Sequence, residues 1–341
     1  MFSWKQGQGS TIRNLVRQEM YDQVASLALK DRKVAFELVE LLQESEAEVG
    51  ENAAEAIGRI GRDNLEIPET VKLVMPRLKD LLEHPRAQVR EVTTQALVNI
   101  AWNRLMWEDI GEIMRPLIAW FTKLLYDPDV RVRRNALGGI RVAAEWMEDN
   151  GQDADIALLA PTLPQLLAFL TDAEPSSRGD AVWALTPIAH RNPEMVEPMV
   201  GEIVRLLKDS NDHVRLGASA TLRYVAEAHP ETVWPSLSTL LLLLKDPDWR
   251  VCQNAAIALG FIAGNTPEVA KVVVPKLTEL LGDKRALFRA DAASALARLG
   301  ETNPDMVRPA LPQLEALLED DDERVRQSAV EAVRRIRNAN S

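Results

Sequence analysis

The sequence predicts an all-α solenoid of about eight stacked helix pairs, preceded by a capping helix. A repeated phrase, helical spacing of apolar residues within each copy, and the lack of any strand pattern all indicate this fold class. The clearest copies are DSNDHVRLGASATL (209–222), DPDWRVCQNAAIAL (246–259), DKRALFRADAASAL (283–296) and DDDERVRQSAVEAV (320–333). A catalytic motif is normally written once, whereas a phrase repeated at a fixed period is a structural unit.

One site in each copy, here called the reference position, fixes the period. Successive reference positions are 40, 43, 45, 37, 37, 37 and 37 residues apart, and six of the eight are arginine. Three residues further on stands a small residue in nearly every copy, and seven further on an apolar one, as on one face of a helix. The reference positions are Gly50, Arg90, Arg133, Arg178, Arg215, Cys252, Arg289 and Arg326.

Two further signals indicate where the helices of each repeat begin. Six residues before each reference position stands an acid or, once, a histidine, which suits the start of a second helix where backbone N–H groups are free. Proline followed by an acid, as in Asn192-Pro193-Glu194 and Asn303-Pro304-Asp305, predicts the start of a first helix. Each repeat is therefore expected to be helix, turn, helix.

These residues resemble HEAT repeats, and the resemblance covers roughly residues 33 to 338. It is carried by the phrases DVRVRRNAL, DHVRLGASA and DERVRQSAV and by prolines inside the first helices: Pro116, Pro164, Pro198, Pro235, Pro275 and Pro309. The resemblance implies a right-handed α-α superhelix in which each reference arginine lies near the acid of an adjacent repeat. Gly50 and Cys252 depart from the pattern, so this ladder should be interrupted there.

The predicted organisation has two parts. Residues 1–32 are expected to form a tail and a capping helix, and residues 33–341 eight HEAT-like repeats in one solenoid domain. The segment TIRNLVRQEMYDQVASLALK is amphipathic and suits the cap. A cap is needed because one helix pair cannot bury its own apolar face.

Composition narrows the possible partners. The chain has 341 residues and a net charge of −11, which disfavours nucleic acid and favours a basic or amphipathic protein or peptide. No apolar run is long enough for a membrane helix, and the start of the sequence does not resemble a signal peptide, so we expect a cytoplasmic protein.

The single cysteine, Cys252, excludes an internal disulfide and is expected to be a buried, inert thiol. The oligomeric state is left open.

The residues give no sign of catalysis. The four histidines, His84, His190, His213 and His229, form no pair with the spacing of metal ligands on one helix face. There is no phosphate-binding loop, since GQGS near the N-terminus is not followed by Lys-Ser or Lys-Thr. We therefore predict no catalytic, cofactor-binding or metal-binding residues, no cofactor, and a protein that is not an enzyme.

Two surfaces are candidates for partner binding. Second helices of such solenoids line the concave surface, where large and charged side chains are expected at Trp102, Arg134, Arg141, Trp183, His190, Arg223 and Tyr224. The longer spacings between repeats predict an edge patch with Trp107, Trp146 and Met147. Either set of large side chains could instead serve packing between neighbouring repeats.

Taken together, the sequence predicts a non-enzymatic scaffold or adaptor that offers its concave surface to a protein or peptide. One alternative is an accessory or lyase-type protein that acts on another protein's cofactor. A weaker alternative is a nucleic-acid-associated protein that uses a local arginine patch.

Overall fold

The computed structural model describes residues 8–60, 69–102, 111–150, 156–264 and 266–338. Within these ranges every regular element is an α-helix or a short 3₁₀ helix, and none is a strand. The chain forms two compact units, unit 1 (residues 1–166) and unit 2 (residues 167–341), and each is described by itself. A single solenoid domain over residues 33–341 stays a prediction.

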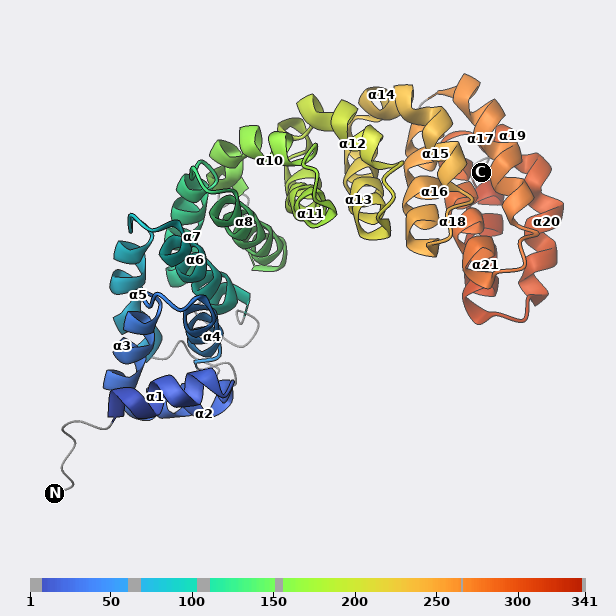
Figure 1. Cartoon of the computed structure of the whole chain (residues 1–341). Helices are drawn as coiled ribbons and strands as arrows, with labels where there is room; N and C mark the ends of the chain where they lie inside the picture. Colours follow the sequence, from blue (N-terminus) through green and yellow to red (C-terminus); the bar gives the residue numbers. More distant parts are fainter. Residues whose placement is uncertain (1–7, 61–68, 103–110, 151–155, 265, 339–341) are drawn as a thin grey trace. The chain divides into compact units, whose positions relative to one another are not determined.

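Unit 1 opens with two helices and continues with helix pairs (Figure 1). In each pair a first helix leads through a short turn into a second helix that contains the reference position. The elements are α1 (Gln8–Arg17), α2 (Tyr21–Lys30), α3 (Arg32–Leu41), α4 (Ala47–Gly58), α5 (Glu69–Leu81), α6 (Ala87–Trp102), α7 (Gly111–Leu124), α8 (Val130–Asn150) and η2 (Ala157–Thr162).

Unit 2 repeats the same plan, but most of its first helices are broken into short pieces. The breaks fall at prolines such as Pro198, Pro235 and Pro309, because proline lacks an N–H and its ring crowds the preceding turn. The elements are α10 (Leu163–Phe169), which begins before the unit boundary, α11 (Pro175–Arg191), η3 (Pro193–Met195), η4 (Glu197–Met199), α12 (Val200–Leu206), α13 (Asp212–Ala228), α14 (Pro230–Val233), η5 (Trp234–Ser236), α15 (Leu237–Leu243), α16 (Trp249–Gly264), α17 (Pro267–Leu280), α18 (Ala286–Thr302), α19 (Pro304–Val307), η6 (Arg308–Ala310), α20 (Leu311–Ala316), η7 (Leu317–Glu319) and α21 (Glu323–Asn338).

The second helices of unit 2 pack against one another in chain order. Figure 1 shows α11, α13, α16, α18 and α21 side by side in a single layer, and the consecutive helices are in contact. Small residues allow this close packing: Ala218, Ala255 and Ala292, three residues after the reference positions, are fully buried. At Gly217 a methyl group would lie 2.6 Å from Val182 Cγ1, so α13 approaches α11 too closely for a larger residue.

A ladder of arginine–aspartate pairs joins neighbouring repeats. Arg215 donates from Nε and Nη2 to the two carboxylate oxygens of Asp246 at 2.9 and 3.3 Å. Its Nη1 donates to the backbone oxygen of Asp209, in the turn of its own repeat, at 2.9 Å. The same arrangement joins Arg90 to Asp127, Arg178 to Asp209 and Arg289 to Asp320. The predicted ladder is confirmed at these junctions.

The ladder is interrupted at Gly50 and Cys252, as predicted. Cys252 is buried, and its Sγ donates to the backbone oxygen of Leu244 at 3.3 Å. Burial raises the pKa of this thiol to about 12, so it stays protonated and unreactive at neutral pH. Asp283, the acid without an arginine from the preceding repeat, pairs with Arg285 in its own turn at 3.0 Å.

The N-terminal cap consists of two helices, α1 and α2, where a single helix was predicted. Glu19 has φ = 56°, and the N–H groups of Glu19 and Met20 bond to the carbonyls of Val16 and Leu15. This is the left-handed termination that ends many helices, usually with glycine in the place of Glu19. The sequence did not reveal the break because glutamate is an uncommon residue in that conformation.

We predict that Asp209→Ala lowers the free energy of unfolding by about 2–4 kcal/mol, because Arg178 is left half-buried without its carboxylate. Asp283→Ala is the matched control. Asp283 accepts the backbone N–H of Arg285 as Asp209 accepts that of Asn211, so both variants lose this hydrogen bond within the turn. Asp283→Ala removes no arginine pair between repeats and should cost about 1 kcal/mol. Urea unfolding of both variants measures the difference, and equal losses would contradict a stabilising ladder.

The same pair has a predictable pH dependence. Burial alone would raise the pKa of Asp209, but hydrogen bonds from Arg178 and from the N–H of Asn211 hold that pKa below its ordinary value of 3.8. The contribution of the pair is therefore fully present above pH 3.8 and is lost as the pH falls through the lowered pKa.

Candidate partner-binding surface

The second-helix layer of unit 2 has one face that is not packed against the first helices. At about 100° per residue, positions 1, 5, 8, 9 and 12 after each reference position share this side of a helix. We call it the second-helix face. Its large and charged side chains are Trp183, His190, Arg223, Tyr224, Glu227, Phe261, Arg298, Glu301, Glu331, Arg334 and Arg335.

The centre of the second-helix face is a stack of three side chains from α11 and α13. The rings of His190 and Tyr224 lie 4.3 Å apart at 23°, and the Arg223 guanidinium lies 4.1 Å from the centre of the Tyr224 ring. Tyr224 remains half-exposed and His190 exposed. The structure thus brings together three of the residues that the sequence predicts for the patch.

A second cluster, on α16, α18 and α21, was not included in the predicted patch. The Arg298 guanidinium lies 5.1 Å from the centre of the Phe261 ring, and Arg335 pairs with Glu301 at 2.6 Å. Tyr224, Phe261, Arg298 and Arg335 all stand nine residues after their reference positions. That shared register was the signal in the sequence that could have added Phe261 and Arg298.

Trp183 contributes mainly to packing. Its Nε1 donates to the backbone oxygen of His213 at 3.2 Å, and its ring stacks on the His213 ring at 5.4 Å. These contacts fix the start of α13 against α11. Trp183 is half-exposed, so it can border a partner but is already engaged with its own chain.

The predicted residues of unit 1 form a separate small cluster. The Arg141 guanidinium lies 5.0 Å from the centre of the Trp102 ring and pairs with Glu145 at 2.5 Å. Trp102 is 51% exposed. Arg134, on the same helix as Arg141, is half-buried.

The predicted edge patch is not displayed on the surface of unit 1. Trp146 and Met147 are 3% and 1% exposed, so they pack inside the unit. Trp107 lies outside the described residues. The longer helix α8 explains the burial, because its last turns carry both side chains back onto the packed layer.

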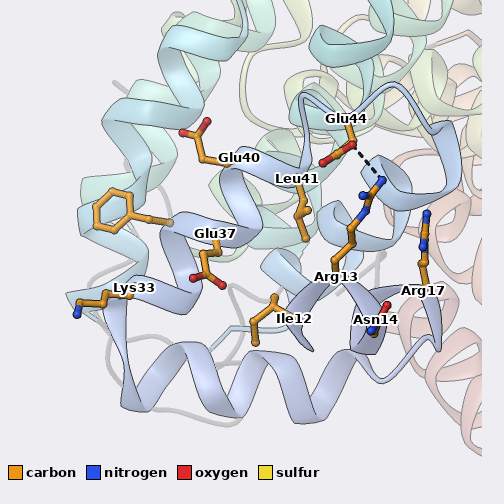
Figure 2. A pocket seen from close by; sticks show the side chains of 10 residues that line it. Ile12, Arg13, Asn14, Arg17, Lys33, Glu37, Glu40, Leu41 and Glu44 are labelled. Carbon is orange, nitrogen blue, oxygen red and sulfur yellow. Dashed lines mark hydrogen bonds and ion pairs between the residues drawn. The ribbon is translucent and has the colours of Figure 1, made fainter. Parts of the chain in front are cut away.

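A pocket of about 870 Å³ lies between α1 and α3, and the sequence did not predict it (Figure 2). Its walls carry both signs of charge, and Arg13 bonds to Glu44 at 3.2 Å and to Glu46 at 3.1 Å. Figure 2 shows Arg13 and Glu44 meeting on one side of the pocket. Because Glu44 stands six residues before a reference position, Arg13 does for the first repeat what the ladder arginines do elsewhere.

The described residues show neither a metal-ion cluster nor a membrane-spanning helix. Within them, no group of three His, Cys, Asp or Glu side chains is arranged to hold a metal ion. None of their helices combines the length and the apolar character needed to cross a bilayer. His229 is surrounded by carboxylates, with Glu194, Glu197 and Glu231 at 3.3–3.7 Å.

Comparison with known proteins agrees with this geometry. The family model of HEAT repeats matches residues 206–297 and 237–334. Residues 206–334 are therefore similar to HEAT repeats. The resemblance predicted from the sequence is confirmed there, whereas a search of curated proteins gave no match.

Solved structures extend the likeness of fold beyond the HEAT match. An engineered protein is 22% identical to this chain, with a TM-score of 0.57. The match covers 98% of this chain and 97% of the engineered protein. A designed armadillo repeat protein in complex with the peptide (KR)4 is 25% identical over 64% of this chain and 99% of its own, with a TM-score of 0.55. A structure of armadillo repeat proteins designed for modular peptide recognition is 25% identical, with a TM-score of 0.53. The match covers 64% of this chain and 99% of the designed chain.

One buried acid beside the second-helix face is poorly compensated. Asp291 is 9% exposed, and its Oδ1 accepts from Gln253 Nε2 at 2.8 Å, while its Oδ2 has no hydrogen-bond partner. Burial raises the pKa of Asp291 to about 6, although Gln253 and Arg324 act in the opposite direction. The folded chain therefore binds this proton more tightly than the unfolded chain does.

We predict that Asp291→Asn stabilises the protein above pH 6. The folded pKa exceeds the ordinary value of 3.8, so the wild type gains stability as the pH falls from about 7 to about 4. The variant should lack this gain and be about 1–3 kcal/mol more stable at pH 8. Thermal unfolding at pH 4.5 and pH 8 measures the stabilities, and Asp321→Asn in an exposed turn is the control. A wild-type protein whose stability does not rise on acidification would contradict the prediction.

Proposed function

We propose that this protein is a non-enzymatic scaffold whose second-helix face in unit 2 binds a protein or peptide partner. One observation carries the proposal. Tyr224 and Phe261, at the same position in neighbouring repeats, are half-exposed, and each has an arginine guanidinium against its ring. Half-exposed aromatic rings flanked by arginine are the composition that dominates binding hot spots.

The solved structures support this choice of ligand. The designed armadillo proteins with this fold include one in complex with a peptide and others made for peptide recognition. An extended segment laid across α13, α16 and α18 would meet one ring or guanidinium in each repeat. Repetition of the contact from helix to helix is how a solenoid accumulates affinity from modest individual contacts.

The remaining predicted residues take lesser parts in the proposal. Trp102, Arg134 and Arg141 would offer a second contact area in unit 1, and Trp183 would border the site in unit 2. The net charge of −11 favours a basic or amphipathic partner, as the sequence predicts. Trp146 and Met147 are assigned to packing because both are buried.

We predict that Tyr224→Ala/Phe261→Ala loses the main protein partner in affinity purification from native lysate followed by quantitative mass spectrometry. Truncating two hot-spot rings typically weakens binding by a hundredfold or more, since each costs about 2 kcal/mol. The matched control is Trp234→Ala/Leu242→Ala, which removes apolar side chains that are 45% and 69% exposed on the first-helix side.

Circular dichroism should show both variants folded. A partner retained by the Tyr224/Phe261 variant but lost by the control would place the binding surface on the first helices. It would thereby overturn the proposed site.

A further inference from the structure

The arginines of unit 2 differ in their partners, and Arg326 donates to the backbone oxygens of Asp320 and Asp321 rather than to a carboxylate. Most pair with a carboxylate, either across a repeat junction or within one turn or helix. The paired ones are Arg178, Arg205, Arg215, Arg250, Arg285, Arg289, Arg308, Arg324, Arg334, Arg335 and Arg337. Since the chain carries more acids than bases, pairing is the ordinary condition of an arginine in this protein.

Arg223 and Arg298 form no ion pair with any described carboxylate. Each instead lies against an aromatic ring, Tyr224 at 4.1 Å and Phe261 at 5.1 Å. The Nε of Arg223 is buried and has no acceptor. A guanidinium stacked on a ring keeps its N–H donors in one plane, ready to bond a planar carboxylate with two parallel hydrogen bonds.

The acids of the second-helix face do not neutralise these two arginines. Glu227 stands one helical turn beyond Arg223 and is exposed. Glu301 stands one turn beyond Arg298 but is taken by Arg335 at 2.6 Å. Two unpaired guanidinium groups therefore remain on helices α13 and α18, with Phe261 of α16 between them in chain order.

We propose that the second-helix face of unit 2 binds an extended acidic peptide, with two of its carboxylates received by Arg223 and Arg298. The proposal rests on the proposed function but makes the partner acidic, in place of the basic character that the net charge favours. Adjacent helices pack roughly 8–10 Å apart, so α13 and α18 are separated by roughly 16–20 Å. At about 3.3 Å per residue, this span corresponds to about five or six residues. Side chains alternate along an extended peptide, so acids about six residues apart lie on the same side of it.

The local charge outweighs the net charge in this choice. At physiological salt, exposed charges more than about 8 Å apart are largely screened from one another. A peptide on the second-helix face is therefore governed by Arg223 and Arg298 within contact distance, and much less by the acids distributed over the rest of the chain.

A single-stranded nucleic acid could also stack on Tyr224 and Phe261, but its charge pattern fits less well. Such ligands need a continuous basic track along the phosphate backbone. On the second-helix face the arginines alternate with Glu227, Glu301 and Glu331. Separate acidic side chains can avoid these glutamates, whereas a phosphate at every nucleotide cannot.

The test uses the purified full-length chain and an array of random twelve-residue peptides. We expect the bound peptides to be enriched in Asp and Glu about six residues apart. The best of them is then measured by fluorescence anisotropy against Arg223→Gln, Arg298→Gln and the double variant. Each substitution should weaken binding about tenfold, as expected for the loss of a charged hydrogen-bonded pair. Oligo-dT and the basic peptide (KR)4 serve as competing probes.

Two further variants make the sign of the charge decisive. Arg205→Gln/Arg308→Gln removes the same net charge from exposed arginines on the first-helix side and should leave the affinity unchanged. Glu227→Gln removes a carboxylate from the second-helix face and should tighten the acidic peptide several-fold. The Arg223 and Arg298 variants are expected to fold, since neither side chain joins two repeats through an ion pair. Thermal melts check this.

The outcomes separate this proposal from the proposed function. If acid-rich peptides bind the double variant as tightly as the wild type, the assignment of their carboxylates to Arg223 and Arg298 is overturned. Bound peptides rich in Lys and Arg, or without charge preference, overturn the acidic partner but leave a peptide-binding scaffold. Tight binding of oligo-dT lost in the double variant replaces the peptide by a nucleic acid. If no peptide binds, the acidic partner and the peptide-binding function both fail.

Discussion

The bidentate pair between an arginine and the aspartate of the next repeat is the interaction on which each unit depends. In Arg215 one side chain bonds the carboxylate of Asp246 and the turn carbonyl of Asp209 together. The aspartate in turn accepts the backbone N–H of Asp248 at 2.9 Å. One contact therefore fixes the turn within a repeat and the spacing to its neighbour, which is what a stack whose repeats contact only their neighbours requires.

Because the ladder holds the turns, the rest of each second helix is divided between two tasks. One side carries small and apolar residues, such as Ala218 and Leu222, that are fully buried against the neighbouring helices. The other side is free to vary from repeat to repeat except where, as at Trp183, it packs against the next helix. That freedom explains why the aromatic and unpaired cationic side chains gather there, at Tyr224, Phe261 and their arginines.

Arginine thus has two distinct roles in one sequence. At the junctions the guanidinium is paired, half-buried and structural, with side chains 12–17% exposed and a pKa raised further by the aspartate hydrogen bonds. On the second-helix face it is stacked on a ring and left without a carboxylate at Arg223 and Arg298. The same residue type stabilises the stack in one place and remains available to a ligand in another.

The sequence by itself determined the helix pairs, because these depend on spacings within one or two repeats. Its resemblance to HEAT repeats implied the ladder and the gaps at Gly50 and Cys252. The sequence also placed His190, Arg223 and Tyr224 on one helix face. Only the tertiary structure decided that the cap breaks at Glu19, that Trp146 and Met147 are buried, and that Arg298 stacks on Phe261. Burial and pairing depend on which side chains meet across neighbouring helices, and the period of a sequence does not specify those meetings.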